Sequence, residues 1–331
     1  MRISSLEARR ARLASAMLLA ALGGCARTEG AVPDTNRAGH DASLRALMAD
    51  AGQWPSYGRD YTNQRYSPLT QVTTGNVAQL ALAWHFKTGV AESFENSPLV
   101  VGRTMYVTTP MNHLFALDAV TGAKKWEYVH PLGTTTACCG PVNRGAAYYG
   151  GRVYMATLDG QVVALDTADG HPAWTVQVVD NKKGYSITMA PVIVDGKVIV
   201  GASGAEYGIR GRVTALDAND GALVWRWYTI PSPDEGGWWG TWKTTDPFGT
   251  PMNRDVASEK RDSAKYADAW KRGGGSVWQA PAIDTARGLV ILTVNNPSPD
   301  IDGVVRPGDN LYTDCIVALD LRTGKLKWYF Q

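Results

Sequence analysis

The sequence predicts an all-β fold, a β-propeller of four-stranded antiparallel blades that is incomplete in this chain. One phrase, A-L-D-x-x-x-G-x-x-x-W, occurs four times and ends at Trp126, Trp174, Trp225 and Trp328. The intervals between these tryptophans are 48, 51 and 103 residues, and the longest interval holds long insertions within one unit. Repeated units of about 40–50 residues that each hold four short strands are typical of propeller blades.

Each phrase forms the second half of such a unit. An apolar strand, an Asp/Gly turn and a further strand indicate a β-hairpin, in which the Gly suits a turn with positive φ. The Trp can fill the wedge between neighbouring blades. We also expect a strand around Trp84 and helices over residues 43–49 and 257–270. Strand pairs are expected before the hairpins, as in residues 97–101 with 104–107, 190–194 with 197–200, and 280–283 with 289–294.

The composition indicates a folded protein without a nucleic-acid partner, and the N-terminal segment indicates export. Of the 331 residues, 44% are apolar and the net charge is only +2, so a large core is available and a basic nucleic-acid surface is not indicated. Arg9, Arg10 and Arg12 precede an apolar run over residues 13–22 that is too short to span a bilayer. Residues 1–24 are therefore predicted to be a signal peptide. The run ends in Leu22-Gly23-Gly24-Cys25, which resembles a lipobox, and an ordinary signal peptide is the alternative.

Export would place the mature chain in the periplasm, and a lipid on Cys25 would anchor it to the outer membrane. Residues 25–53 are interpreted as a linker and N-terminal extension, and residues 54–331 as a partial propeller. In an oxidising compartment the adjacent Cys138 and Cys139 can form a disulfide, whereas metal binding would be expected in the cytosol. Cys315 lies in an apolar stretch and is predicted to be a buried, inert thiol.

The start of the propeller region carries further motifs. These are Trp54-Pro55-Ser56-Tyr57-Gly58-Arg59-Asp60, Arg65-Tyr66-Ser67-Pro68-Leu69, Asn76-Val77 and Ala83-Trp84. Together with the repeated phrase, they resemble the quinoprotein family of alcohol and methanol dehydrogenases, whose members are eight-bladed propellers that use pyrroloquinoline quinone (PQQ). The resemblance runs from about residue 54 to residue 331. Four full blades alone would leave a blade face and strand edges exposed, so we expect the chain to be part of a larger product.

The resemblance implies PQQ as the cofactor and indicates which residues bind it. A flat tricarboxylate needs two flat walls, which would be a strained ring formed by a Cys138–Cys139 disulfide and the indole of Trp278. Trp278 follows a Gly run that lets the backbone approach a ligand, and core packing is its alternative role. Cations, hydroxyls and backbone N–H groups would bind the polar edge of the cofactor. The residues implied for these roles are Arg144, Thr188, Ser203, Gly204 and Ala205, and Glu95 matches a further cofactor contact of the family.

Glu206 and Asn296 are the implied metal ligands. Glu206 ends a Gly-rich turn, and Asn296 follows an expected strand, 18 residues after Trp278, which matches the spacing in the family. Carboxylate and amide oxygens suit a hard cation such as Ca²⁺. A second acidic ligand, which would favour a lanthanide, would lie beyond Gln331, so the identity of the metal stays open.

The implied reaction is the oxidation of a small alcohol, with electrons passed to a cytochrome c or a membrane quinone. The metal would act as a Lewis acid, while the protein orients the reactants. In the family the catalytic base is an Asp that soon follows a K-W-x-x-Q phrase, and here Lys327-Trp328-Tyr329-Phe330-Gln331 ends the sequence. The base is therefore expected beyond Gln331, and this polypeptide alone is expected to be inactive. The sequence has no C-x-x-C-H haem motif, so we expect the acceptor to be a separate cytochrome or another domain.

A non-catalytic outer-membrane lipoprotein scaffold is the second interpretation. Such a propeller would share the lipobox and the repeated phrase, but it has no need for adjacent cysteines, for Trp278 or for the Glu206 and Asn296 pair. Those residues therefore discriminate between the two functions. A separate group, Trp238, Trp239 and Trp242, lies in a Gly-rich insertion. It either forms an apolar rim over a substrate entrance or packs the insertion onto its own propeller.

Overall fold

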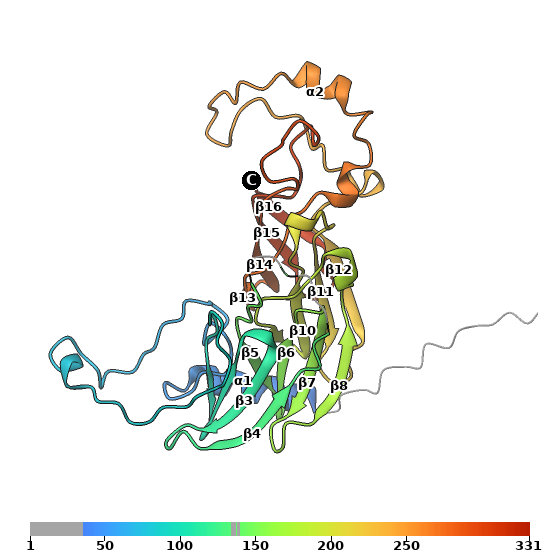
Figure 1. The fold of residues 1–331 in the computed structure, drawn as a ribbon. Coiled ribbons are helices and arrows are strands. Elements are labelled where there is room, and N and C mark those ends of the chain that lie inside the picture. The colour runs from blue at the N-terminus through green and yellow to red at the C-terminus, as the bar shows by residue number, and fades with distance from the viewer. Residues whose placement is uncertain (1–35, 134–136, 138–139) are drawn as a thin grey trace, which may run out of the picture. The chain divides into compact units, whose positions relative to one another are not determined.

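The computed structural model describes residues 36–133, 137 and 140–331 of the chain. In this part, sixteen strands form four antiparallel sheets of four strands each (Figure 1). In each sheet the four strands lie side by side in the order in which they follow one another in the sequence. The predicted all-β architecture of four-stranded blades is confirmed.

The sheets follow the order of the chain, and each ends in one copy of the repeated phrase. The first sheet contains β1 (Leu99–Val101), β2 (Thr104–Thr108), β3 (His113–Asp118) and β4 (Lys124–Val129). The second contains β5 (Ala146–Tyr149), β6 (Arg152–Ala156), β7 (Gln161–Asp166) and β8 (Pro172–Gln177). The third contains β9 (Val192–Val194), β10 (Lys197–Gly201), β11 (Arg212–Asp217) and β12 (Leu223–Tyr228). The fourth contains β13 (Ala282–Asp284), β14 (Leu289–Val294), β15 (Cys315–Asp320) and β16 (Leu326–Phe330).

The tryptophan of one phrase packs against the glycine of the next. The indole of Trp126 lies so close to Gly170 that a Cβ on this glycine would stand 2.6 Å from the ring. The backbone of Gly170 also has a φ of 78°, a conformation that residues other than glycine rarely adopt. The position therefore requires glycine for two independent reasons. The same contact joins Trp84 to Gly122, Trp174 to Gly221, and Trp225 to Gly324.

A hydrogen bond fixes the orientation of each docked indole. Trp126 Nε1 donates to the carbonyl of Thr167 at 2.9 Å, in the turn that Gly170 closes. That turn is held by Asp166, whose carbonyl accepts from Gly170 N at 2.9 Å and whose carboxylate accepts from Ala168 N at 2.8 Å. The other three indoles donate to the residue in the equivalent place, which is Ala119, Ala218 and Leu321. Each sheet is thus tied to the next by the same small joint.

The first strands of the sheets lie at the inside of the fold. Strand β5 packs against both β1 and β9, and apolar side chains such as Leu99, Ile193 and Val194 are buried in these strands. The segments before these strands also pair through the backbone, since Ser97 N donates to Arg144 O and Arg144 N donates to Thr188 O, both at 3.1 Å. The residues that precede β1, β5 and β9 are therefore held side by side.

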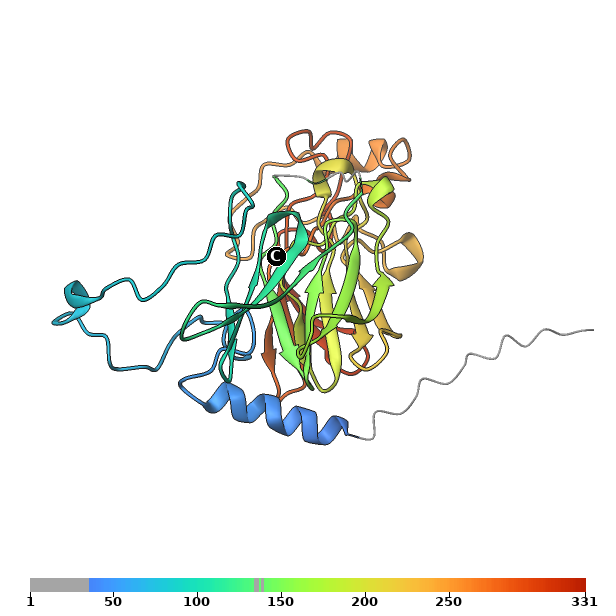
Figure 2. The same ribbon diagram turned by 60° about the horizontal axis from the view of Figure 1, so that its bottom comes forward.

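The helices begin and end differently from the prediction. Helix α1 (Arg37–Ala49) begins six residues before the expected start, at residue 43, and buries Leu44 and Met48 against β5 (Figure 2). Tyr149 donates its hydroxyl to Asp41 at 2.9 Å, so this part of the N-terminal extension is folded onto the second sheet. The expected helix over 257–270 is divided into α2 (Val256–Asp262) and the 3-10 helix η6 (Ala269–Arg272). No helix in the described part of the chain is both long and apolar enough to cross a membrane.

The prediction of a strand around Trp84 is wrong. Residues 80–87 join none of the four sheets (Figure 1). The Trp84 ring nevertheless packs against Gly122, as the tryptophans of the repeated phrase do against the glycines that follow them. Side-chain docking and strand pairing are therefore separable here.

Further short 3-10 helices lie in the loops and are η1 (Val77–Gln79), η2 (Pro110–Asn112), η3 (Asn181–Lys183), η4 (Ala205–Tyr207) and η5 (Pro233–Glu235).

The joint between sheets can be tested at Gly170. In Gly170→Ala the new Cβ meets the Trp126 indole and the residue must keep a positive φ, so we expect the free energy of unfolding to fall by about 2–5 kcal/mol. Gly102→Ala is the matched control, because Gly102 has φ of 59° but a Cβ there meets no atom within 4 Å. It should cost only about 1–2 kcal/mol. Urea unfolding followed by tryptophan fluorescence measures both variants, and equal losses would contradict the role of the joint.

Candidate functional site

One cavity gathers most of the residues that the sequence indicated as a binding site. Its volume is about 320 Å³, which is within the range of small-molecule sites. The cavity is completed by Val142, Ser276 and Asn295. The indicated residues that line it are Arg144, Thr188, Ser203, Gly204, Glu206, Trp278 and Asn296.

The topology of the sheets explains why these residues meet. Arg144, Thr188 and Trp278 lie two to four residues before β5, β9 and β13, the first strands of three consecutive sheets. Glu206 follows β10 and Asn296 follows β14, the second strands of the third and fourth sheets. In an antiparallel pair the start of one strand lies beside the end of its partner, so both kinds of loop leave the sheet at the same end.

Arg144 is the centre of the polar network in the cavity. Its guanidinium forms an ion pair with Glu95 at 2.7 Å and donates to the Thr188 hydroxyl at 2.8 Å. The same cation lies over the Trp278 indole, 4.7 Å from the ring centroid, and the Thr188 hydroxyl is 2.9 Å from that of Ser203. A largely buried planar cation, two hydroxyls and a flat aromatic face therefore stand together, which is a donor set for a flat anionic molecule.

Glu206 and Asn296 offer oxygen atoms to the same cavity. The Asn296 amide nitrogen donates to Pro297 O and to the carboxylate of Asp300, while no described residue donates to its amide oxygen. Glu206 is exposed and takes part in no ion pair within the described part of the chain. These are oxygen ligands of the kind that hard cations prefer. No group of three or more His, Cys, Asp and Glu among the described residues could hold a metal, so a cation would need further ligands from outside this pair.

Two implied residues support the cavity without lining it. Glu95 reaches it only through its ion pair with Arg144. Ala205 is fully buried and its N–H donates to the Ser276 hydroxyl at 2.9 Å, so this donor is engaged within the protein. Gly204, by contrast, opens onto the cavity and has φ of 118°. Cys25, Cys138 and Cys139 lie outside the described residues, and the lipid and the disulfide assigned to them stay predictions.

Ser276 and Asn295 belong to the site although the sequence assigned them no role. The Ser276 carbonyl accepts from Asn295 N at 2.9 Å and from the Asn295 side chain at 3.0 Å, and its hydroxyl holds the Ala205 N–H. Ser276 therefore links the turn that carries Glu206 to the loop that carries Asn296. The signal was present, because Ser276 precedes Trp278 by two positions and Asn295 is next to Asn296.

The tryptophans of the insertion favour the packing interpretation. Trp238 is only 1% exposed and lies against Ile230 and Gly273, and the Trp239 and Trp242 rings stack with centroids 6.1 Å apart. None of these three side chains lines the cavity around Arg144. Backbone hydrogen bonds from Leu311 N to Trp238 O and from Asp309 N to Trp239 O, both at 2.8 Å, attach the insertion to the segment between β14 and β15.

Comparison with known proteins identifies the family. Residues 54–331 match the family model for the PQQ glucose/ethanol/alcohol dehydrogenase β-propeller domain. The chain belongs to this family. The match begins at Trp54, where the predicted propeller region begins, and it includes all four sheets.

Similar members of the family are named alcohol dehydrogenases. The quinohemoprotein alcohol dehydrogenase ADH IIB of Pseudomonas putida is 40% identical over 88% of this chain and 41% of the relative. The lanthanide-dependent methanol dehydrogenase of Methylacidiphilum fumariolicum (strain SolV) is 39% identical over 87% of this chain and 47% of the relative. The solved structure of quinohemoprotein alcohol dehydrogenase ADHIIG from Pseudomonas putida HK5 matches with a TM-score of 0.73 and 39% identity, over 88% of this chain and 41% of that one. The chain thus spans less than half the length of these relatives.

Cys315 is buried, as predicted, and its reactivity can be tested. The side chain is 3% exposed, its thiol donates to Thr313 O at 3.1 Å, and burial raises the pKa of the thiol to about 12. Because the thiolate is the reactive form, we expect iodoacetamide to leave Cys315 unlabelled in the folded protein at pH 8 and to label it in urea. Peptide mapping by mass spectrometry resolves this cysteine from the others. Rapid native labelling of Cys315 would show that this strand is not packed as described.

Proposed function

We propose that the chain is the cofactor-binding part of a PQQ- and metal-dependent alcohol dehydrogenase of the periplasm. The main support is that Arg144, Thr188 and Trp278, from three different sheets, line one cavity with Glu206 and Asn296. Membership of the family and the names of its similar members support the same reaction class.

The residues of the cavity fit the cofactor. PQQ is a flat tricarboxylate, and the cavity offers a planar cation, the Thr188 and Ser203 hydroxyls and an indole face. Bound PQQ would supply the redox centre that accepts two electrons from the alcohol. Arg144 would neutralise one carboxylate, and its ion pair with Glu95 and hydrogen bond to Thr188 would orient the guanidinium for this task.

Trp278 would form one wall of the cofactor site, and the predicted Cys138–Cys139 disulfide would form the opposite wall. Glu206 and Asn296 would hold a hard cation beside the cofactor, and oxygens of the cofactor or water would complete its six to eight ligands. Ca²⁺ is the proposed ion, with a lanthanide as the alternative, since one relative is named a lanthanide-dependent enzyme. We assign the catalytic base to none of the described residues.

The proposal for the whole protein rests on its relatives. A small alcohol would be the substrate, and a cytochrome c or a membrane quinone would accept the electrons, as the names quinohemoprotein alcohol dehydrogenase and alcohol dehydrogenase (quinone) suggest for those proteins. The predicted signal peptide over residues 1–24 would place the protein in the periplasm, and the lipid predicted on Cys25 would anchor it to the outer membrane. The scaffold interpretation differs in one measurable respect, because a scaffold has no reason to bind PQQ.

Binding of PQQ by the purified chain tests the proposal. Added PQQ with Ca²⁺ should quench tryptophan fluorescence and should remain with the protein as a visible chromophore after gel filtration. In Arg144→Gln the loss of charge-assisted hydrogen bonds should raise the Kd for PQQ about 10- to 100-fold. Arg103→Gln is the control, since Arg103 pairs with Asp118 at 2.8 Å, outside the cavity. If the wild-type chain retains no chromophore, the scaffold interpretation is favoured.

The metal ligands are tested by the dependence of PQQ binding on Ca²⁺. Removing Ca²⁺ with a chelator should weaken PQQ binding to the wild-type chain. In Glu206→Gln the Ca²⁺ concentration needed for half-maximal binding should rise at least about tenfold, because an anionic ligand of a hard cation is lost. Glu92→Gln removes the charge of an exposed glutamate outside the cavity and should change nothing. Equal Ca²⁺ dependence in the wild type and Glu206→Gln would exclude Glu206 as a ligand.

A further inference from the structure

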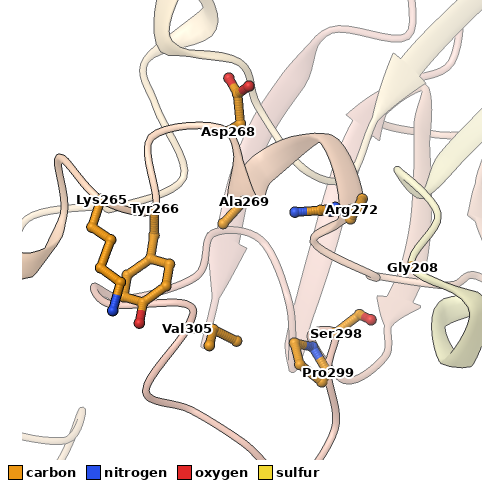
Figure 3. Close-up of a pocket in the computed structure, with 9 residues that line it drawn as sticks. All are labelled: Gly208, Lys265, Tyr266, Asp268, Ala269, Arg272, Ser298, Pro299 and Val305. Atoms are coloured by element: carbon orange, nitrogen blue, oxygen red, sulfur yellow. The ribbon is translucent and has the colours of Figure 1, made fainter.

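A second cavity, of about 400 Å³, shares two loops with the proposed PQQ site (Figure 3). Glu206 lines the first cavity, and Gly208, which caps the same 3-10 turn η4, lines the second. Asn296 lines the first cavity, and Ser298, two residues further along the chain, lines the second. The residues around the second cavity are Gly208, Lys265, Tyr266, Asp268, Ala269, Arg272, Ser298, Pro299 and Val305.

We propose that this second cavity binds the carboxylate end of the substrate, so that the enzyme prefers hydroxycarboxylic acids to neutral alcohols of the same length. The inference deepens the proposed function and rests on it for the oxidation of the hydroxyl. The binding of a carboxylate, however, depends only on residues of the second cavity.

The charge in the cavity is positive. In Figure 3 the Arg272 side chain points from η6 into the cavity, and Lys265 and Tyr266 line the side opposite Arg272, with the Lys265 nitrogen beside the Tyr266 hydroxyl. Neither cation belongs to an ion pair within the described part of the chain. Asp268 is the one acid in the lining, and its carboxylate is directed away from the cavity in Figure 3 and pairs with Lys271 at 3.0 Å. The lining thus holds two cations and no carboxylate directed into the cavity, which favours an anionic ligand.

The remaining walls suit a carbon chain. Ala269, Pro299 and Val305 present apolar surface to the cavity, and Figure 3 shows Val305 and Pro299 along the side opposite η6. A phosphate or sulfate ion has no apolar groups to bury against this surface, whereas the methylene groups of a carboxylic acid would bury apolar area there. The combination therefore indicates an organic acid with an aliphatic body.

The cavity is held open by contacts that need no ligand. Ser298 N donates to Gly273 O at 3.0 Å, and the Arg306 guanidinium donates to Pro299 O at 2.9 Å. The side-chain stem of Arg272 lies over Gly208, where a Cβ would stand 3.4 Å from the Arg272 Cβ. The stem is thereby placed against the turn that also carries Glu206, so the two cavities are positioned by the same backbone.

Carboxylate binding is tested first, on the 331-residue chain without PQQ. Ligand-observed NMR with hexanoate and hexan-1-ol should show binding of hexanoate with at least about tenfold higher affinity. Arg272→Gln and Lys265→Gln should each weaken hexanoate binding about tenfold, since each removes a charge-assisted hydrogen bond. Lys271→Gln is the matched control, with the same charge change in the same segment but a side chain paired with Asp268. The proposal is overturned if hexanoate affinity is the same in all four proteins or falls equally in Lys271→Gln.

Substrate preference is tested second, on the larger product expected to contain this chain and the catalytic base, loaded with PQQ and Ca²⁺. The ratio of kcat/KM for 6-hydroxyhexanoate to that for hexan-1-ol should fall about tenfold in Arg272→Gln and should keep the wild-type value in Lys271→Gln. If Arg272→Gln leaves this ratio unchanged although the wild-type chain binds hexanoate, the cavity is an anion site away from the substrate. The substrate assignment would then be rejected. If hexan-1-ol is not oxidised at all, the proposed function fails, while the hexanoate titration still decides whether the cavity binds carboxylates.

Discussion

The docking of each indole on the glycine of the next turn is the constraint on which the rest of the structure depends. A four-stranded sheet has two faces to bury. The Trp–Gly contact and one hydrogen bond from the indole N–H set how far each sheet is rotated relative to the preceding sheet. Because the joint is repeated, the first strands stay together at the inside. The loops at one end of three sheets then converge without any direct requirement for a ligand.

Arg144 shows how that convergence forms the proposed binding site. Its backbone pairs with the segments before β1 and β9, and its side chain reaches Glu95, Thr188 and Trp278. A cation held this firmly loses little conformational entropy when an anion binds, so more of the interaction energy appears as affinity. Ser276 has a similar supporting role on the other side, where it joins the turn before Glu206 to Asn295.

The parts of the fold that depend on local spacing were predictable from the sequence. The repeated phrase correctly indicated the four hairpins and the packing of tryptophans between neighbouring sheets, but not the contact of each indole with a glycine. Arg144 and Trp278, which the resemblance assigned to one site, line the same cavity. The strand around Trp84 was not formed, because pairing depends on a neighbour that the local sequence does not specify. The second cavity was also missed. Its walls come from an insertion positioned by Arg254, whose ion pairs with Glu259 and the buried Asp309 connect segments far apart in the chain.

The joint between the third and fourth sheets has a particular consequence. Trp225 of the third sheet docks on Gly324 of the fourth and donates its N–H to Leu321 O at 3.0 Å, while Glu206 and Asn296 leave these same two sheets at the cavity. The distance between the Glu206 carboxylate and the Asn296 amide oxygen therefore depends on the angle between the third and fourth sheets. Neither residue takes part in the Trp225–Gly324 contact between these sheets. In the proposed cation site, selection between ions of different radius could thus evolve through aromatic packing remote from Glu206 and Asn296, with both residues left unaltered.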